Sequence, residues 1–238
     1  MNIFLAGAAG VIGRRLVPLL RDTGHAVTGT TRSRERAAAL EALGAHGVVV
    51  DVFDARALLR AMVAAHPDVV IHQLTDLPQT IDPASRPSEF EANARVRIDG
   101  TRNLMAAASF AGARRVVAQS IAFAYAPGQG TRLESDPLDL DGPRAATVRA
   151  VASLEQQVMG MPGIDGVVLR YGRLYGPGTW YASATGAGPL HVDAAAHAAL
   201  LAVTKGQGVY NIAEDDGAAS IVKARQELGF DPEFRLKR

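Results

Sequence analysis

The chain has 238 residues, of which 48% are hydrophobic and 21% are charged, and its formal net charge is +1. This composition is typical of one soluble globular unit, and a charge so close to neutral does not indicate a nucleic-acid partner. The sequence has no cysteine, which excludes disulfides, thiolate nucleophiles and cysteine-ligated metals and favours a cytoplasmic protein. No stretch approaches the ~20 apolar residues of a membrane span, so we expect none.

Short apolar runs rich in β-branched residues alternate along the chain with segments of helical period. The expected strands cover residues 2–6, 25–30, 47–51, 68–72, 115–119, 166–170 and 208–212. The expected helices cover residues 11–22, 34–43, 55–65, 88–111, 144–159, 193–203 and 219–228. Runs such as VVV and VVI show no polar alternation, so helices should cover both faces of the sheet. The pattern predicts an α/β protein with a doubly wound parallel sheet.

The segment GAAGVIG follows the first expected strand and opens the first expected helix. In dinucleotide-binding units Gly7 would permit the tight turn, Gly10 would let the backbone approach a pyrophosphate, and Gly13 would let the helix pack on the strand. The phosphates would then meet free N–H groups at the helix N-terminus, which Val11 and Ile12 supply. The motif and its position predict a dinucleotide site.

The end of the second expected strand, HAVTGTTRSRER, indicates which dinucleotide binds. Thr31 stands where an NAD site has a carboxylate for the ribose 2′-hydroxyl, and Arg32 offers a cation for the 2′-phosphate of NADP. Arg34 and Arg36 fall on the next expected helix, where we interpret them as part of a solvent-facing surface. NADP is therefore favoured as the cofactor, with NAD as the alternative.

Further cofactor contacts are expected where the third and fourth strands end. Asp51 is placed to contact an adenine amino group; its alternative role is a helix cap, for which Asp54 competes. Val52 beside it, and Gln73 and Leu74 after the fourth strand, are expected to line the same site.

Several segments resemble the extended short-chain dehydrogenase/reductases of the NAD-dependent epimerase/dehydratase group: GAAGVIG, EANARVRIDGTRNLMAAA, the serine-bearing strand end VVAQS, LRYGRLYGPGTWY, LHVDAAAHAALLAV and GVYNIAEDD. The resemblance covers most of the chain. It implies a Rossmann-type domain over residues 1–170 and a small, shortened C-terminal substrate portion over residues 171–238 that completes the fold without folding independently. It also implies a small-molecule substrate and, often, a homodimer. Asn93 and Asn103 match positions that steady the helix or approach the active site, and we add Asn93 to the cofactor contacts.

The chain departs from the catalytic pattern of this family. Relatives pair a strand-end serine, here Ser120, with Tyr-x-x-x-Lys on the next helix, where the tyrosine exchanges the substrate proton and the lysine lowers its pKa. Alignment of ATVRAVASLEQQV places Thr147 and Val151 at those positions, and no Tyr-x-x-x-Lys occurs in the sequence. The candidates for a rearranged catalytic apparatus are Ser120, Tyr125, Tyr175 and Arg149.

Three functions remain open at this point. The favoured one is an NAD(P)-dependent oxidoreductase or epimerase/dehydratase-like enzyme acting on a small carbonyl, alcohol or sugar. The second is a catalytically weak dinucleotide-binding sensor or regulatory protein, and the third is a structural relative that binds no dinucleotide. The short region after YGPG argues against carrying over nucleotide-sugar specificity. The histidines show no paired-ligand spacing, so no metal is expected, and His191 and Asp193 are expected to anchor the substrate portion.

Overall fold

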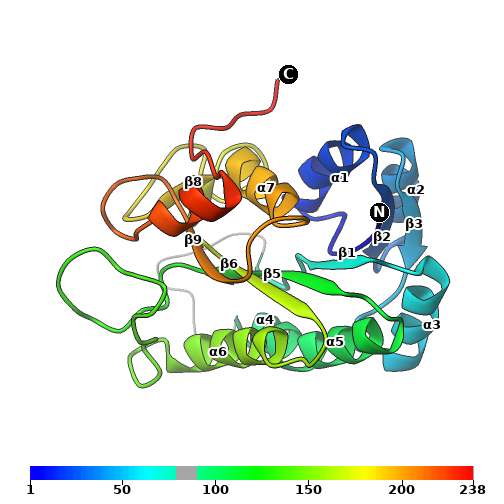
Figure 1. The fold of residues 1–238 in the computed structure, drawn as a ribbon, viewed down its shortest axis with the longest axis horizontal. Helices are drawn as coiled ribbons and strands as arrows, with labels where there is room; N and C mark the ends of the chain where they lie inside the picture. Colours follow the sequence, from blue (N-terminus) through cyan, green and yellow to red (C-terminus); the bar gives the residue numbers. More distant parts are fainter. Residues whose placement is uncertain (79–89, 238) are drawn as a thin grey trace.

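The main sheet is parallel throughout and carries helices on both faces (Figure 1). The computed structural model describes residues 1–78 and 90–237. Seven strands lie in the order β3-β2-β1-β4-β5-β6-β9, and β7 pairs with β8 in a separate sheet. The strands are β1 (Asn2–Ala6), β2 (Ala26–Thr31), β3 (His46–Val49), β4 (Val69–His72), β5 (Arg115–Ile121), β6 (Asp165–Tyr171), β7 (Arg173–Tyr175), β8 (Pro189–His191) and β9 (Gly208–Ile212).

The helices form one layer on each side of the sheet. They are α1 (Gly13–Asp22), α2 (Arg34–Ala42), α3 (Ala55–Ala65), α4 (Glu91–Arg95), the π-helical turn η2 (Val96–Gly100), α5 (Thr101–Phe110), α6 (Ala145–Met159), α7 (Val192–Leu201) and a second π-helical turn η3 (Ala224–Leu228). Figure 1 shows α1 and α7 above the sheet and α5 and α6 below it.

Two apolar cores follow from the alternation of side chains along each strand. Ile3 and Leu5 of β1 belong to the core under α1 and α7, whereas Phe4 and Ala6 belong to the core under α3, α5 and α6. Because both faces are buried, the strands read as nearly continuous apolar runs. The predicted doubly wound parallel sheet is confirmed.

All seven predicted main-sheet strands are present, each within two residues of its expected ends. The first residues of the helix predicted at 88–111 lie outside the described residues, and its described part runs through α4, η2 and α5. The helix predicted at 219–228 is wrong in its first three residues, since the helical residues are 222–228. Ala219 forms a β-bridge with Arg132, and the Ser220 amide donates to the Arg132 carbonyl, so the helical turns begin later.

The C-terminal portion contributes to the main sheet through β9, which pairs with β6. The short strands β7 and β8, which we did not expect, flank the Gly/Pro-rich loop between them. The division at residue 170 stays a prediction. Among the described helices, none combines the length and the apolar composition needed to cross a membrane.

Candidate functional site

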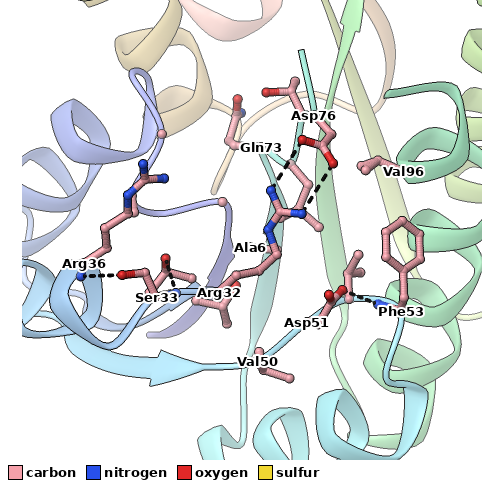
Figure 2. Close-up of a pocket in the computed structure, with 18 of the residues that line it drawn as sticks. Ala6, Arg32, Ser33, Arg36, Val50, Asp51, Phe53, Gln73, Asp76 and Val96 are labelled. Carbon is pink, nitrogen blue, oxygen red and sulfur yellow. Dashed lines mark hydrogen bonds and ion pairs between the residues drawn. The ribbon is translucent and has the colours of Figure 1, made fainter. Parts of the chain in front are cut away.

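A cleft lies at the carboxyl ends of β1 to β4, where open parallel sheets bind their ligands (Figure 2). Eight of the predicted cofactor contacts line it: Gly7, Gly10, Thr31, Arg32, Asp51, Val52, Gln73 and Leu74. Val11, Ile12 and Gly13 form the start of α1 behind this lining. Asn93 lies buried in α4, so it acts on the cleft through a neighbour, as described below.

The glycine turn after β1 has the geometry that the motif predicts. Gly7 has a φ of +86°, and a Cβ there would lie 2.5 Å from the carbonyl oxygen of Gln73. A Cβ at Gly13 would lie 2.4 Å from the Ala8 carbonyl oxygen, so only glycine lets α1 start against the turn. A Cβ at Gly10 would meet only the Gly7 carbonyl oxygen, at 3.2 Å, which leaves the space above this residue open.

The N-terminus of α1 offers free hydrogen-bond donors to this space. Ile12, the N-cap residue, has no side chain that could cap the helix. Within residues 1–78 and 90–237, the amides of Val11, Ile12 and Gly13 have no protein acceptor. Free amides and the positive end of the helix dipole together favour a phosphate at this position.

Arg32 spans the cleft and binds Asp76 on the opposite side (Figure 2). Its Nη1 and Nη2 atoms each lie 3.4 Å from a carboxylate oxygen of Asp76. The Asp76 amide in turn donates to Oδ1 of Asn93 at 3.0 Å. Asn93 therefore positions Asp76, which holds Arg32.

Arg36 lines the cleft as well, beside Ser33, and sequence reasoning missed both residues. The Ser33 hydroxyl caps α2 by accepting a hydrogen bond from the Arg36 amide at 3.3 Å. This cap places Arg36 in the first turn of α2, next to the end of β2. Arg36 is exposed on α2, as we expected, and its side chain also lines the cleft.

Two roles were considered for Asp51, a helix cap and a contact to adenine, and the helix cap belongs to Asp54. Asp54 caps α3, because its Oδ1 accepts from the Ala57 amide at 2.9 Å. Asp51 accepts from the Phe53 amide at 2.9 Å and keeps its carboxylate at the cleft. Asn103 steadies this corner by donating from Nδ2 to the carbonyl of the adjacent Val52.

Ser120 and Tyr125 lie in one buried hydrogen-bond network centred on Arg170. The Ser120 hydroxyl donates to Oε1 of Glu155 at 2.6 Å. Arg170 donates from Nε to the same oxygen at 2.9 Å and from Nη2 to Oε2 at 2.7 Å. Arg170 also donates from Nη1 to the Tyr125 hydroxyl, which itself donates to Oδ1 of Asn211 at 2.6 Å. Both predicted residues are therefore committed to protein partners.

The positions of the missing tyrosine and lysine do not offer a replacement. Val151 is fully buried in an apolar cluster with Ala124 and Val148. Burial raises the pKa of Tyr125, against the opposing charge of Arg170, so its hydroxyl stays neutral near pH 7.

Tyr175 and Arg149 make their hydrogen bonds outside the network of Ser120 and Tyr125. The Tyr175 hydroxyl donates to Glu214 at 2.6 Å and accepts from Arg235 at 3.0 Å. Arg149 is exposed and donates to the Leu140 carbonyl and to Asp141. The structure brings Ser120 and Tyr125 together and leaves the other two candidates outside their network. Over the described residues, His, Asp and Glu side chains form no group of three that could hold a metal ion.

Asp193 anchors the C-terminal portion, as expected. Its Oδ1 accepts from Nε of Arg15 at 2.7 Å, and its Oδ2 accepts from the Leu236 amide at 3.2 Å. Arg15 also donates to the Val11 and Pro177 carbonyls. One guanidinium thus fastens α7 and the YGPG turn to the glycine turn. His191 supports this anchor by capping α7, since its Nδ1 accepts from the Asp193 amide.

His72 is a further buried polar residue beside the site. Its Nδ1 accepts from the Leu74 amide, which identifies Nε2 as the nitrogen that donates to the Thr101 hydroxyl at 2.9 Å. Burial, assisted by the charge of Arg97, lowers the pKa of His72 to about 4.

Acidification should therefore destabilise the fold through His72. Between pH 6.5 and about 4 the unfolded chain binds a proton at this residue that the folded protein does not. Stability from this residue is complete above pH 6.5 and falls by about 3 kcal/mol as the pH drops to 4. Urea unfolding of wild type and His72→Gln across this range tests the expectation. Parallel pH profiles for the two proteins would refute it.

Comparison with known proteins gives the family. The model of the NAD dependent epimerase/dehydratase family matches residues 3–187. The chain belongs to this family. A relative from Streptomyces sp named 3-diazoavenalumate denitrifying reductase is 44% identical, with 92% of this chain and 77% of the relative covered. The uncharacterized sugar epimerase YhfK of Bacillus subtilis is 30% identical over 49% of this chain and 51% of its own.

Solved structures share the fold. UDP-glucose 4-epimerase of Thermotoga maritima with UDP-glucose superposes with a TM-score of 0.78 at 19% identity, covering 99% of this chain and 94% of the epimerase. MoeE5 in complex with UDP-glucuronic acid and NAD also gives 0.78, at 21% identity, covering 99% and 95%. At these identities the likeness establishes the Rossmann-type α/β fold, and the ligands are those of the named proteins.

Proposed function

We propose that this protein is an NADP-dependent reductase that acts on a small molecule. The observation that carries the proposal is the charge pattern at the end of β2. Arg32, Ser33 and Arg36 line the cleft beside the glycine turn, and Thr31 replaces the carboxylate that an NAD site would have. When bound, the cofactor supplies a hydride from its nicotinamide.

The cleft residues fit this cofactor along its length. The free amides of Val11 and Ile12 would bind the pyrophosphate, and Asp51 would bind the adenine amino group. Gln73 is 5% exposed, and within the described chain its Oε1 has no hydrogen-bond partner. A buried unpaired oxygen at the cleft would accept a ribose hydroxyl, so the chain holds an acceptor ready for this group.

The ion pair between Arg32 and Asp76 is compatible with a 2′-phosphate. The Arg32 side chain is 62% exposed, and an exposed pair at 3.4 Å contributes little stability. A phosphate with nearly two negative charges is a stronger partner for the guanidinium than one carboxylate. Binding of NADP would therefore shift Arg32 from Asp76 to the phosphate.

The reductase activity is supported by the 44% identical relative, whose name is that of a reductase. That relative is also named for a diazo substrate, so an aryl diazonium salt belongs in the assay beside ketones and aldehydes. An aryl diazonium accepts hydride at its terminal nitrogen to give an aryldiazene. The aryldiazene then loses N₂, and its hydrogen takes the place of the diazo group on the ring to give the arene. This reaction needs no proton from the protein, which suits a site whose Ser120 hydroxyl is engaged by Glu155.

A cytoplasmic location and a homodimer remain predictions.

Arg32→Ala and Arg36→Ala should each weaken NADPH binding by about tenfold or more, because a hydrogen bond to a charged group contributes about 1.5–3 kcal/mol. NADH binding should not change. Arg34→Ala is the matched control, since Arg34 lies in the same helical turn but does not line the cleft. Isothermal titration of all four proteins with both cofactors gives the answer. A loss in Arg32→Ala that is equal for NADPH and NADH would contradict the NADP assignment.

The sensor function is the second candidate, and the engaged hydroxyls of Ser120 and Tyr125 favour it. Oxidation of NADPH in the presence of a substrate distinguishes a reductase from a sensor. A sensor would bind NADPH tightly and oxidise none of it in the presence of ketones, aldehydes, nucleotide sugars or aryl diazonium salts. A reductase would oxidise NADPH with at least one of these classes.

A further inference from the structure

Arg173 and Phe123 lie side by side just past the carboxyl ends of two neighbouring strands. Ile121, the last residue of β5, pairs with Tyr171, the last residue of β6, and Phe123 and Arg173 each follow two residues later. The Cζ atom of Arg173 lies 5.0 Å from the centre of the Phe123 ring. The Tyr171 hydroxyl accepts a hydrogen bond at 3.1 Å from Gln73, which lines the cleft. Arg173 therefore stands next to the cleft, over the strands that follow β4 in the sheet.

The guanidinium of Arg173 has no hydrogen-bond acceptor and no ion-pair partner in the described part of the chain. Its Nε atom is fully buried, and a Cβ at Gly186 would lie only 3.1 Å from it, so the loop before β8 packs on the inner end of this side chain. The residue as a whole is half-buried, and its Nη1 and Nη2 atoms are not enclosed. Packing thus holds the guanidinium in place and leaves two donors free at its accessible end.

Arg144 brings a second guanidinium to the same ring. Its Cζ atom lies 5.6 Å from the centre of the Phe123 ring, and its Nη2 atom donates to the Phe123 carbonyl at 2.6 Å. Arg144 is the N-cap residue of α6, whose first turn holds no acidic residue, although the positive end of the helix dipole disfavours a cation at this position. Within the described residues, no carboxylate forms an ion pair with Arg144 or with Arg173. Two cations therefore flank one aromatic ring without a counter-charge.

We propose that Arg173, assisted by Arg144, binds a carboxylate of the substrate, which makes the substrate a small organic acid. The assignment rests on the proposed reductase function and adds to it the chemical class of the substrate. The Nη1 and Nη2 atoms of a guanidinium are parallel donors that match the two oxygens of a carboxylate. A carboxylate there would supply the counter-charge that both arginines lack, at strand ends where open parallel sheets bind their ligands.

Benzoate, phenyl phosphate and the neutral benzamide test this assignment. Each is titrated into the NADPH-saturated protein, in which the cations at the end of β2 are occupied, and the melting temperature and the dissociation constant are measured. Benzoate should bind and raise the melting temperature, whereas benzamide, which has the same ring and no charge, should do neither. Benzoate that binds no better than benzamide would overturn the proposal. Tighter binding of phenyl phosphate than of benzoate would show a phosphate site and overturn the carboxylate assignment.

Substitutions at the two arginines show where benzoate binds. Arg173→Met should weaken its binding about tenfold or more, because hydrogen bonds to a charged group are lost. Arg173→Lys keeps the charge without the paired donors and should retain part of the binding, and Arg144→Gln should cause a smaller loss than Arg173→Met. Arg114→Gln is the matched control and should bind benzoate as the wild type does, since Arg114 is exposed, pairs with Asp68 and lies before β5, at the opposite end of that strand.

The melting temperatures without ligand distinguish a binding role from a structural one. Arg173→Met should melt close to the wild-type temperature, because the guanidinium makes no hydrogen bond within the described residues. If this variant does not fold, Arg173→Lys decides in its place. Wild-type affinity for benzoate in either Arg173 variant would overturn the proposal.

The same titrations separate the two proposals. Wild-type protein that binds neither NADPH nor NADH would refute the reductase function, and benzoate binding to the free protein would then test Arg173 alone. Protein that binds NADPH but does not prefer benzoate over benzamide would refute the Arg173 assignment and leave the reductase function intact.

Discussion

Replacement of Glu155 by alanine is expected to lower the free energy of unfolding by about 3–5 kcal/mol. The side chains of Glu155 and Arg170 are only 9% and 6% exposed, so neither charge is compensated by water. Loss of the carboxylate would leave Arg170 unpaired, near the second buried cation Arg97. The Ser120 hydroxyl would lose its acceptor in the same step.

Two further variants show whether the loss comes from the stranded charge. Ser120→Ala removes only one hydrogen bond and should cost about 1 kcal/mol. Glu155→Leu combined with Arg170→Met removes both charges and should recover much of the stability lost by Glu155→Ala. Urea denaturation measures all three. A cost below about 1.5 kcal/mol for Glu155→Ala would show that the pair is not the centre of this network.

Gly7→Ala is expected to destabilise the protein by about 3 kcal/mol and to abolish dinucleotide binding. Part of this cost comes from a φ of +86°, which residues with a Cβ rarely adopt. The larger part comes from the Cβ itself, which would lie 2.5 Å from the Gln73 carbonyl oxygen and would force the ends of β1 and β4 apart. The cleft lies between those strand ends.

Gly112→Ala separates the two contributions. Gly112 has a φ of +79° but would place its Cβ in open space. Its substitution should cost about 1 kcal/mol and leave NADPH binding unchanged. Equal costs for the two variants would mean that the glycine turn has room for a side chain, contrary to its proposed close approach.

The strands could be predicted because their sequence signal is local. Each is a short apolar run, and every strand after the first is separated from the one before it by a helical segment or a turn. Because both faces of the parallel sheet are buried, the run is apolar along its length and can be recognised without knowledge of its partners. The helix predicted at 219–228 failed for the opposite reason. Its first residues are recruited by Arg132, which is far away in the sequence, and no local pattern reports that contact.

The lining of the cleft was predictable from motifs, but the partners of the catalytic candidates were not. Gly7 follows β1, and Thr31 and Arg32 stand at the end of β2, so the sequence pattern was enough to place them. Ser120 was correctly placed at a strand end, yet its commitment to Glu155 depends on how α6 packs against β5. Such a contact is a property of tertiary packing.

The burial of Arg97 could have been predicted from helical phase. It lies four residues before the buried Thr101 and seven before Leu104, on the apolar stripe of its helix. Arg95 and Arg102, by contrast, are exposed and pair with Asp99 on the opposite side. One arginine among three on the buried face was the signal. Arg36 had a similar signal, because Ser33 predicts the helix cap that places it beside the cleft.

The relative affinity of the wild-type protein for NADPH and NADH tests the central claim most directly. The two cofactors differ only in the 2′-phosphate, so the ratio of their dissociation constants reports the cationic end of β2 without any substitution. Isothermal titration at low ionic strength should give an NADPH dissociation constant at least about tenfold below that of NADH. Equal affinities, or tighter binding of NADH, would contradict the account.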